Sequence, residues 1–262
     1  MIPKIIHYCW LSNDPIPGSL QTYMKSWKQH LPDYEFILWN FNRFNKDQSI
    51  WVQEAFNKKK YAFAADYIRL YAVYKYGGFY LDMDVEVLKS FDDFLSLKSA
   101  ICWQDGHDGF EAACFGAEKG VPWLKTCLDY YQNKHFINSK NKMELRPLPS
   151  IMEDTLKENG YIIESVSSIK DALSCDAKNL IAVLPNCFFS PKSYQTGKIN
   201  KTEQTHAIHH FTASWVNPYD NKSFFGKILV FFHIPPIGKI WHCLHLPNTN
   251  IRKHLLKKTK TV

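Results

Sequence analysis

The sequence predicts an α/β fold in which strands alternate with amphipathic helices. Apolar, strand-like stretches such as residues 3–10 and 180–185 are separated by stretches whose apolar side chains recur every three or four residues. The chain has 262 residues, of which 45% are hydrophobic, so it can bury a substantial core. This alternation is typical of a sheet flanked by helices rather than of a sandwich or a bundle.

Five elements are expected within residues 1–87, and the last of them is the strand discussed in most detail below. They are a strand at 3–10, a helix at 20–31, a strand at 35–39, a helix at 51–76 and a strand at 77–87. Pro32 ends the first helix, since proline cannot continue it. Gly77 and Gly78 end the second, because glycine is the residue preferred just past a helix C-terminus.

The second half contains further alternation without an internal repeat. Its expected elements are a strand at 100–105, a helix at 121–134 with Pro122 at its start, a helix at 150–160, and strands at 180–185 and 206–211.

Cysteine usage and hydropathy exclude several classes of protein. The seven cysteines form no C-x-x-C pair and their number is odd, so neither a disulfide framework nor a structural zinc site is expected. The N-terminal segment lacks the basic leader and apolar stretch of a secretion signal, and no uncharged run reaches the roughly 20 residues of a membrane span. We therefore expect a cytoplasmic protein.

Positive charge is concentrated in a C-terminal segment, residues 221–262. This segment holds eight basic residues and no Asp or Glu, and it is rich in aromatic side chains. Such a mixture suits an anionic membrane surface, but it equally suits a helical segment packed on the core with a solvated basic end. We expect two parts, a main domain at 1–220 and this basic segment, and no nucleic acid partner because no recognition motif accompanies the charge.

The segment GGFYLDMDVEV, residues 77–87, places two aspartates on one face of the expected strand. The opposite face is apolar and consists of Phe79, Leu81, Met83, Val85 and Val87. Carboxylates at positions i and i+2, here Asp82 and Asp84, project to the same side and can share one hard divalent cation. A cation held by so few protein ligands keeps positions open for other oxygens, such as those of phosphate.

Other polar residues in apolar surroundings are candidates for the same site. Asp66 and Arg69 are three apart on the expected helix and so share a face. Because that helix is otherwise apolar, both charges need partners, and a polar ligand is one candidate. Either His209 or His210, at the end of a late strand, can complete the coordination begun by Asp84.

Five stretches together resemble the DXD-containing retaining glycosyltransferases of family 32, particularly the bacterial capsular polysaccharide transferases. They are IPKIIHYCW, SWKQHLPDYEFILWN, YAFAADYIRLYAVYKYGGFYLDMDVEVLK, FGAEKGVP and IHHFTASW. Yeast initiating mannosyltransferases and the clostridial glucosylating toxins are more distantly similar. The resemblance implies a GT-A fold, a nucleotide-sugar donor and Mn²⁺ or Mg²⁺. Thr212 departs from it, since relatives often carry Asp there.

The resemblance also implies a role for individual residues. Trp10 stacks on the donor base, Asp66 binds ribose or sugar hydroxyls, and Arg69 binds the donor sugar or diphosphate. Tyr80 lines the pocket, Asp82 contacts ribose and metal, and Asp84 binds the metal. His210 is chosen over His209 as a further ligand, and Ser214 with Trp215 covers the diphosphate. Apart from the resemblance, Lys198 in the segment TGK is a further, weaker candidate for a phosphate contact.

We therefore expect a retaining transferase whose catalytic residues are Asp82, Asp84 and Arg69. The two aspartates hold a divalent ion, and this ion, helped by Arg69 or Lys198, offsets the charge of the departing nucleoside diphosphate. UDP-galactose or UDP-glucose are the first expected donors. The expected acceptor is a growing, lipid-linked glycan of a surface or capsular polysaccharide, reached at the inner face of the plasma membrane.

Two alternatives compete with this expectation. The segment YLDMDVEV also resembles the nucleophile motif of haloacid dehalogenase-type phosphohydrolases, in which the first Asp attacks phosphorus. That chemistry needs a late acidic pair, whereas only Glu203 and Asp220 follow Asp176, and they lie far apart. A non-enzymatic membrane-surface module is the second alternative, but it leaves the aspartates and Arg69 unexplained.

Overall fold

The computed structural model describes residues 1–104, 109–175 and 177–212, all of which lie within the unit Met1–Thr212. The expected basic segment at 221–262 and the expected donor contacts Ser214 and Trp215 lie outside the described residues. Within the part of the chain that the structure describes, no helix combines the length and the apolar character needed to cross a membrane.

The described elements follow the alternation that the sequence predicts. The first half comprises β1 (Ile5–Cys9), α1 (Gly18–His30), β2 (Glu35–Trp39), the 3-10 helix η1 (Lys46–Gln48), α2 (Ile50–Asn57), α3 (Tyr61–Tyr76), β3 (Gly78–Leu81) and β4 (Val85–Val87). The second half comprises η2 (Asp92–Phe94), β5 (Ser99–Ala100), β6 (Cys114–Ala117), α4 (Pro122–Asp129), α5 (Leu148–Glu158), β7 (Ile162–Ser165), α6 (Ile169–Ser174), β8 (Leu180–Val183), η4 (Asn186–Phe188) and β9 (Ala207–His209).

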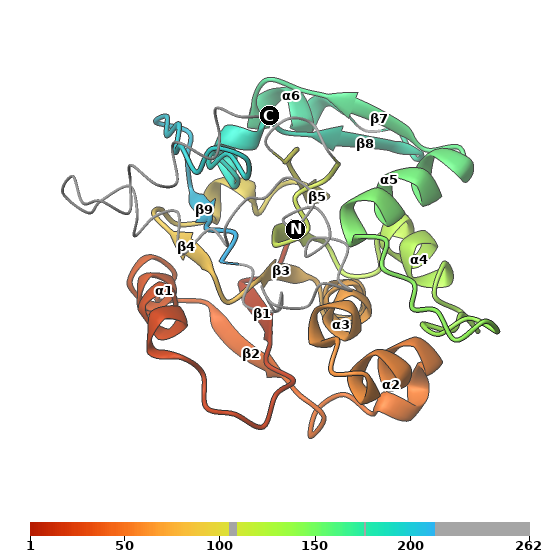
Figure 1. Cartoon of the computed structure of the whole chain (residues 1–262). Helices are drawn as coiled ribbons and strands as arrows, with labels where there is room; N and C mark the ends of the chain where they lie inside the picture. The colour runs from red at the N-terminus through yellow and green to blue at the C-terminus, as the bar shows by residue number, and fades with distance from the viewer. Residues whose placement is uncertain (105–108, 176, 213–262) are drawn as a thin grey trace, which may run out of the picture. The chain divides into compact units, whose positions relative to one another are not determined.

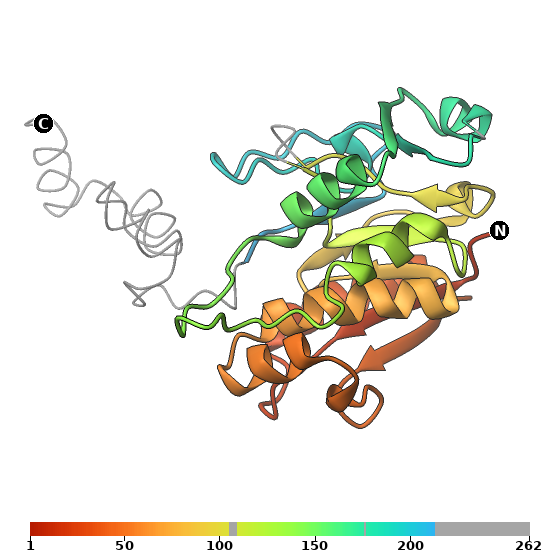
Figure 2. The ribbon, with the colours of Figure 1, turned by 90° about the vertical axis from the view of Figure 1, so that its right-hand side faces the viewer.

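A mixed five-stranded sheet forms the centre of the unit, in the order β2-β1-β3-β6-β5. Strand β1 runs parallel to β2 and β3, whereas β6 runs antiparallel to β3 and β5. Helices α2, α3, α4 and α5 cover one face, and α1 lies on the other face with the two-stranded sheet β4-β9 (Figures 1 and 2). The predicted α/β class is confirmed.

Alternating side chains of β3 fill two separate apolar layers. Tyr80 belongs to the core shared with α2, α3 and α4, whereas Phe79 and Leu81 belong to the core under α1. Met83, Val85 and Val87 lie in that second core as well, so all five residues of the predicted apolar face are buried together. The assignment of faces from sequence is therefore confirmed.

The continuous strand predicted at 77–87 is wrong. Residues 82–84 form a turn in which the Val85 N–H donates to the Asp82 carbonyl (3.0 Å), and β4 then leaves the main sheet to pair with β9. The predicted helix at 51–76 is likewise divided into α2 and α3, because Lys59 adopts a left-handed backbone with φ of 56°. The predicted strand at 100–105 shrinks to Ser99–Ala100.

Helix α1 holds the segment that follows the turn. The buried Trp27 indole N–H donates to the Val85 carbonyl (2.6 Å), and the Val87 N–H donates to Ser26 Oγ (2.9 Å). At the other end of β3, a Cβ on Gly78 would stand 2.6 Å from the Ile5 carbonyl oxygen. Only glycine fits this approach, because φ there is also positive, at 98°. Helix α1 therefore holds the segment after the turn at 82–84, and the close contact of Gly78 with β1 holds the start of the strand before it.

A buried histidine links β1 to the start of β3. Nε2 of His7 lies 2.8 Å from the Gly77 carbonyl oxygen, and Nδ1 accepts the Trp39 indole N–H at 3.1 Å. The neutral ring with its proton on Nε2 satisfies both contacts. Burial lowers the pKa of His7 to about 4, despite the hydrogen bond to Gly77, which acts in the opposite direction.

The stability of the fold is expected to fall in mild acid through His7. Between pH 6.5 and 4 the unfolded chain binds a proton at this residue and the folded chain does not, so acid favours unfolding. The shift corresponds to about 3 kcal/mol of unfolding free energy, lost as the pH falls through that window. Chemical denaturation of wild type and His7→Gln across pH 4–7 measures this. The variant should show a shallower slope, and identical slopes would contradict the assignment.

Candidate metal centre

The turn after β3 brings two carboxylates and one imidazole together. Asp82, Asp84 and His209 each present one ligand atom, and these atoms lie within 4.8 Å of one another. Nε2 of His209 is 3.7 Å from Asp84 Oδ1. The two aspartates that the sequence singles out therefore converge, and the histidine that joins them comes from β9, paired with β4.

His209 is oriented by a buried glutamate. Its Nδ1 lies 3.2 Å from the Glu111 carboxylate, which is itself held by the Ala113 N–H at 2.8 Å. Burial lowers the pKa of His209, but Glu111, Asp84 and Asp82 more than offset this and raise it to about 9. A carboxylate on Nδ1 leaves Nε2 directed at the aspartates, which is the usual arrangement behind a metal-binding imidazole.

Thr212 fixes the carboxylate of Asp84. The Thr212 N–H and hydroxyl donate to Asp84 Oδ2 at 2.7 and 2.9 Å, and the His210 N–H donates to the Asp84 carbonyl at 3.0 Å. Phe211 adopts a left-handed backbone with φ of 52°, which reverses the chain between these contacts. Oxygen Oδ2 is thus occupied, while Oδ1 faces His209. Threonine serves here as a hydrogen-bond donor to Asp84.

Arg69 connects Asp82 to α3. Its guanidinium lies 3.1 Å from Asp82 Oδ2 and 3.3 Å from Asp66 Oδ1, and it donates to the Ala112 carbonyl at 2.8 Å. Tyr80 donates to Asp82 Oδ1 at 2.8 Å and lies under the guanidinium, 4.8 Å from ring centroid to Cζ. The Nε–H of Arg69 is buried without an acceptor among the described residues.

Burial and repulsion perturb the acidic groups of this network. Burial raises the pKa of Asp66 to about 7, with Asp82 adding to the shift and Arg69 opposing it. The pKa of Asp82 is raised as well, by burial and then by Asp84, against the opposing effect of Arg69. Burial lowers the pKa of Arg69, but the neighbouring carboxylate of Asp82 more than compensates and raises it. Burial and mutual repulsion therefore disfavour the simultaneous ionisation of Asp66 and Asp82.

The structure places His210 away from this cluster. Its Nε2 lies 2.8 Å from Glu86 Oε2, and its ring stacks on Tyr23 with centroids 4.5 Å apart. Burial lowers the pKa of His210. Of the two histidines considered from sequence, His209 rather than the chosen His210 faces Asp82 and Asp84.

A lysine that the sequence did not single out lies within electrostatic range of Asp84. The half-buried Lys192 donates from Nζ to the His210 carbonyl at 2.7 Å. Burial lowers its pKa while the charge of Asp84 acts to raise it, so the ammonium is within electrostatic range of that carboxylate. One hydrogen bond leaves two of its three N–H donors for other acceptors. Lys198, the expected phosphate contact, is exposed on the same loop.

Trp10 directly follows β1, at the edge of the sheet where β3 also ends. Its ring is half-buried, and its indole N–H donates to the Asp14 carbonyl at 2.7 Å. The preceding residue, Cys9, is buried beside Tyr80, and burial raises the pKa of its thiol to about 12. Because β1 and β3 run parallel, their C-terminal ends meet at one edge, where α/β sheets commonly bind ligands.

The donor set fits a hard or borderline divalent cation. Two carboxylate oxygens and a neutral imidazole suit Mn²⁺ or Mg²⁺, and a cation of this kind would offset the excess of carboxylates. His209 would release its proton on binding. The sequence assigned no role to Glu111 or Lys192, which carry no motif of their own. It marked Thr212 only as a departure from the family pattern, not as a hydrogen-bond donor to Asp84.

The segment that contains the aspartates also matches a known protein family. Residues 17–100 match the profile of the family described as "Glycosyltransferase sugar-binding region containing DXD motif", a range that includes Arg69, Asp82 and Asp84. This supports the DXD glycosyltransferase part of the expected resemblance.

Several of the curated relatives are named as fungal mannosyltransferases rather than capsular enzymes. Inositol phosphoceramide mannosyltransferase 3 of Schizosaccharomyces pombe is 33% identical over 127 residues, covering 47% of this chain and 35% of the relative. Mannosyl phosphorylinositol ceramide synthase SUR1 of Saccharomyces cerevisiae is 33% identical over 100 residues, covering 37% of this chain and 26% of the relative. The matched stretches thus span about a quarter to a third of these relatives.

Among solved structures, the PaToxG glycosyltransferase is similar with a TM-score of 0.46 and 19% identity, over 61% of this chain and 69% of that one. The chain is thus similar to DXD glycosyltransferases over the segment that builds its aspartate cluster.

Proposed function

We propose that this chain is a metal-dependent glycosyltransferase that moves a hexose from a nucleoside-diphosphate sugar to a hydroxyl group. The observation that carries the proposal is the convergence of Asp82, Asp84 and His209 within 4.8 Å, inside and beside the segment that matches the DXD profile. Three such ligands hold a cation while leaving positions open for diphosphate oxygens.

Breaking the bond from the anomeric carbon to phosphate leaves a nucleoside diphosphate with growing negative charge. Asp82, Asp84 and His209 would hold a divalent cation, which would supply counter-charge at that point. Lys192, within electrostatic range of Asp84, would add a second positive charge, with N–H groups free to bind phosphate oxygen. Arg69 and Tyr80 hold Asp82 in place, so the counter-charge is positioned before the reaction begins.

The buried face of α3 supplies groups for the sugar part of the donor. The buried Arg69 Nε–H has no acceptor among the described residues, and this unmet hydrogen bond supports a role for Arg69 beyond packing. Asp66 contacts Arg69 through Oδ1, and its second oxygen is available to hydroxyl groups. We propose that Asp66 and Arg69 bind the sugar of the donor while Trp10 stacks on the nucleotide base, as the resemblance implies.

The engagement of the carboxylates disfavours a covalent intermediate with the enzyme. Both oxygens of Asp82 accept hydrogen bonds, from Tyr80 and Arg69, and Glu111 is tied to His209 and Ala113. A carboxylate held in this way is a poor nucleophile, which also counts against the phosphohydrolase alternative. We propose that the acceptor hydroxyl attacks on the face that the diphosphate leaves, with phosphate oxygen taking its proton.

The fungal relatives bear on the donor and the acceptor. Their names specify mannosyl transfer to inositol phosphoceramide, so we propose a hexose donor that includes GDP-mannose beside UDP-glucose and UDP-galactose. The proposed acceptor is a sugar or inositol hydroxyl on a lipid-linked molecule, with capsular polysaccharide as one setting. Measuring hydrolysis of these three nucleotide sugars with Mn²⁺ and with EDTA tests the proposal, and it fails if no donor is turned over with metal.

Asp84→Asn is expected to lower transfer or donor hydrolysis at least about 100-fold, because it removes the charge that holds the cation. The asparagine oxygen can still accept from Thr212, so the variant should stay folded. Calorimetric titration with Mn²⁺ and turnover assays check both effects. Asp33→Asn, at an exposed aspartate outside the site, is the matched control. Unaltered Mn²⁺ affinity in the Asp84 variant would remove the metal assignment.

Lys192→Met is expected to weaken binding of a nucleoside diphosphate about tenfold, the loss of one charge-assisted contact. Binding of the corresponding monophosphate, measured with Mn²⁺ present, should change much less. A lysine that merely supports the loop would affect both ligands equally. Lys201→Met, exposed in the same part of the chain, is the control. A selective loss in Lys198→Met instead would return the phosphate contact to the residue expected from sequence.

A further inference from the structure

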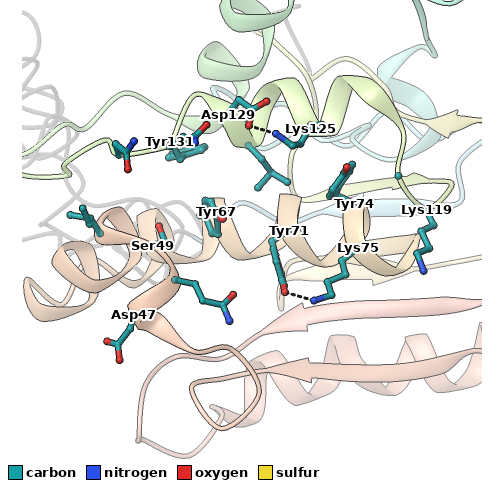
Figure 3. A pocket seen from close by; sticks show the side chains of 16 residues that line it. Asp47, Ser49, Tyr67, Tyr71, Tyr74, Lys75, Lys119, Lys125, Asp129 and Tyr131 are labelled. Carbon is teal, nitrogen blue, oxygen red and sulfur yellow. Dashed lines mark hydrogen bonds and ion pairs between the residues drawn. The ribbon is translucent and has the colours of Figure 1, made fainter.

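A groove lies on a different face of α3 from the aspartate cluster. It has a volume of about 770 Å³ and runs between α3, α4 and the start of α2 (Figure 3). Tyr67, Tyr71 and Tyr74 line it at helical spacing i, i+4 and i+7 and so share one face, whereas Asp66 and Arg69 share another. Its volume is in the range of small-molecule sites.

The tyrosines form a supported aromatic surface. The rings of Tyr67 and Tyr71 are nearly parallel, at 18° with centroids 6.3 Å apart. Phe44 packs edge-on against both, and Tyr131 packs edge-on against Tyr67. The rings are half-buried, so they are fixed from behind while part of each remains accessible. Flat apolar surfaces with hydroxyl tips suit molecules that are apolar on one face and polar at the edge.

Cationic side chains gather at one end of this groove. The Gly120 N–H donates to the Tyr74 carbonyl at 2.8 Å, which brings Lys119 to the end of α3 that carries Lys75. Lys75 donates to the Tyr71 hydroxyl at 2.9 Å and retains two further N–H groups. Lys75 and Lys119 appear at the same end in Figure 3, and Asp47 lies at the other.

The remaining charges of the groove are already partnered. Lys125 forms an ion pair with Asp129 along α4, and Asp47 accepts a hydrogen bond from Gln53 at 3.3 Å. The lysine end is therefore the cationic part, and amide side chains line the rest of the polar rim: Gln48, Gln132 and Asn133. Amides both donate and accept, as hydroxyl-rich ligands require.

We propose that this groove is a second binding site, for a saccharide that carries a negative charge. A sugar ring packs its C–H face on Tyr67 and Tyr71, its hydroxyls meet the amides, and its carboxylate or phosphate lies between Lys75 and Lys119. The site is separate from the aspartate cluster and does not depend on the proposed transfer reaction.

The test uses three probes on the full chain by isothermal titration calorimetry: hexagalacturonate, phosphorylated mannohexaose and neutral maltohexaose. At least one anionic probe should bind with a dissociation constant near or below about 1 mM, and at least about tenfold more tightly than the neutral one. The two anionic arms distinguish carboxylate from phosphate. Absence of anionic binding, or equal affinity for the neutral probe, would overturn the proposal.

Variants locate the bound saccharide. Lys75→Met with Lys119→Met should weaken the anionic probe at least about tenfold, and Tyr71→Ala should weaken all saccharide binding, because it removes the ring. Lys25→Met with Lys28→Met, two exposed lysines on α1, is the matched control and should leave binding as it is. If the control lowers affinity equally, binding is non-specific and the assignment is wrong.

Competition separates this site from the donor site. A nucleoside diphosphate with Mn²⁺ should not displace the anionic saccharide from the wild-type chain, and displacement would place the saccharide at the aspartates instead. Nucleotide binding measured alone reports on the proposed function, so either conclusion can fail while the other stands.

Discussion

Everything at the candidate site depends on holding several carboxylates close together in a poorly solvated place. Arg69 makes this possible, because one guanidinium contacts Asp66, Asp82 and a backbone carbonyl at once. An arginine suits this position better than a lysine, since its planar fork serves several acceptors and keeps its charge when buried. The apolar helix around it excludes water, and so strengthens each of these interactions.

The sequence correctly predicted those features of the fold that depend on neighbouring residues alone. The alternation from Phe79 to Val87 identified which side chains enter the core, and it remained correct although the strand breaks, because apolar burial constrains every second residue on both sides of the turn. The glycines after α3 ended the helix as expected. Both have positive φ, and a side chain would clash with Pro3 and Lys119 at Gly77 and with Ile5 at Gly78. The fold also brings together the four charged residues that the sequence singled out, Asp66, Arg69, Asp82 and Asp84.

Features that depend on distant pairing were not predictable in this way. In a continuous strand Asp84 would share a face with Glu86, but the turn separates them, and the register of β4 with β9 directs His209 to the aspartates and His210 to Glu86. The choice between adjacent histidines was therefore decided by a contact more than a hundred residues away in sequence. Lys192 gave no signal for the same reason, since only the folded loop places its ammonium near Asp84.

Phe211 suggests how firmly this corner of the molecule is assembled. A left-handed backbone at a residue with a side chain costs about 1–2 kcal/mol, and here the ring contact with His209 and the two Thr212 bonds to Asp84 oppose that cost. His210 and Thr212 flank this reversed residue, and both donate hydrogen bonds to Asp84. The conformation of one residue therefore decides whether the backbone and the side chain of Asp84 can be held at the same time.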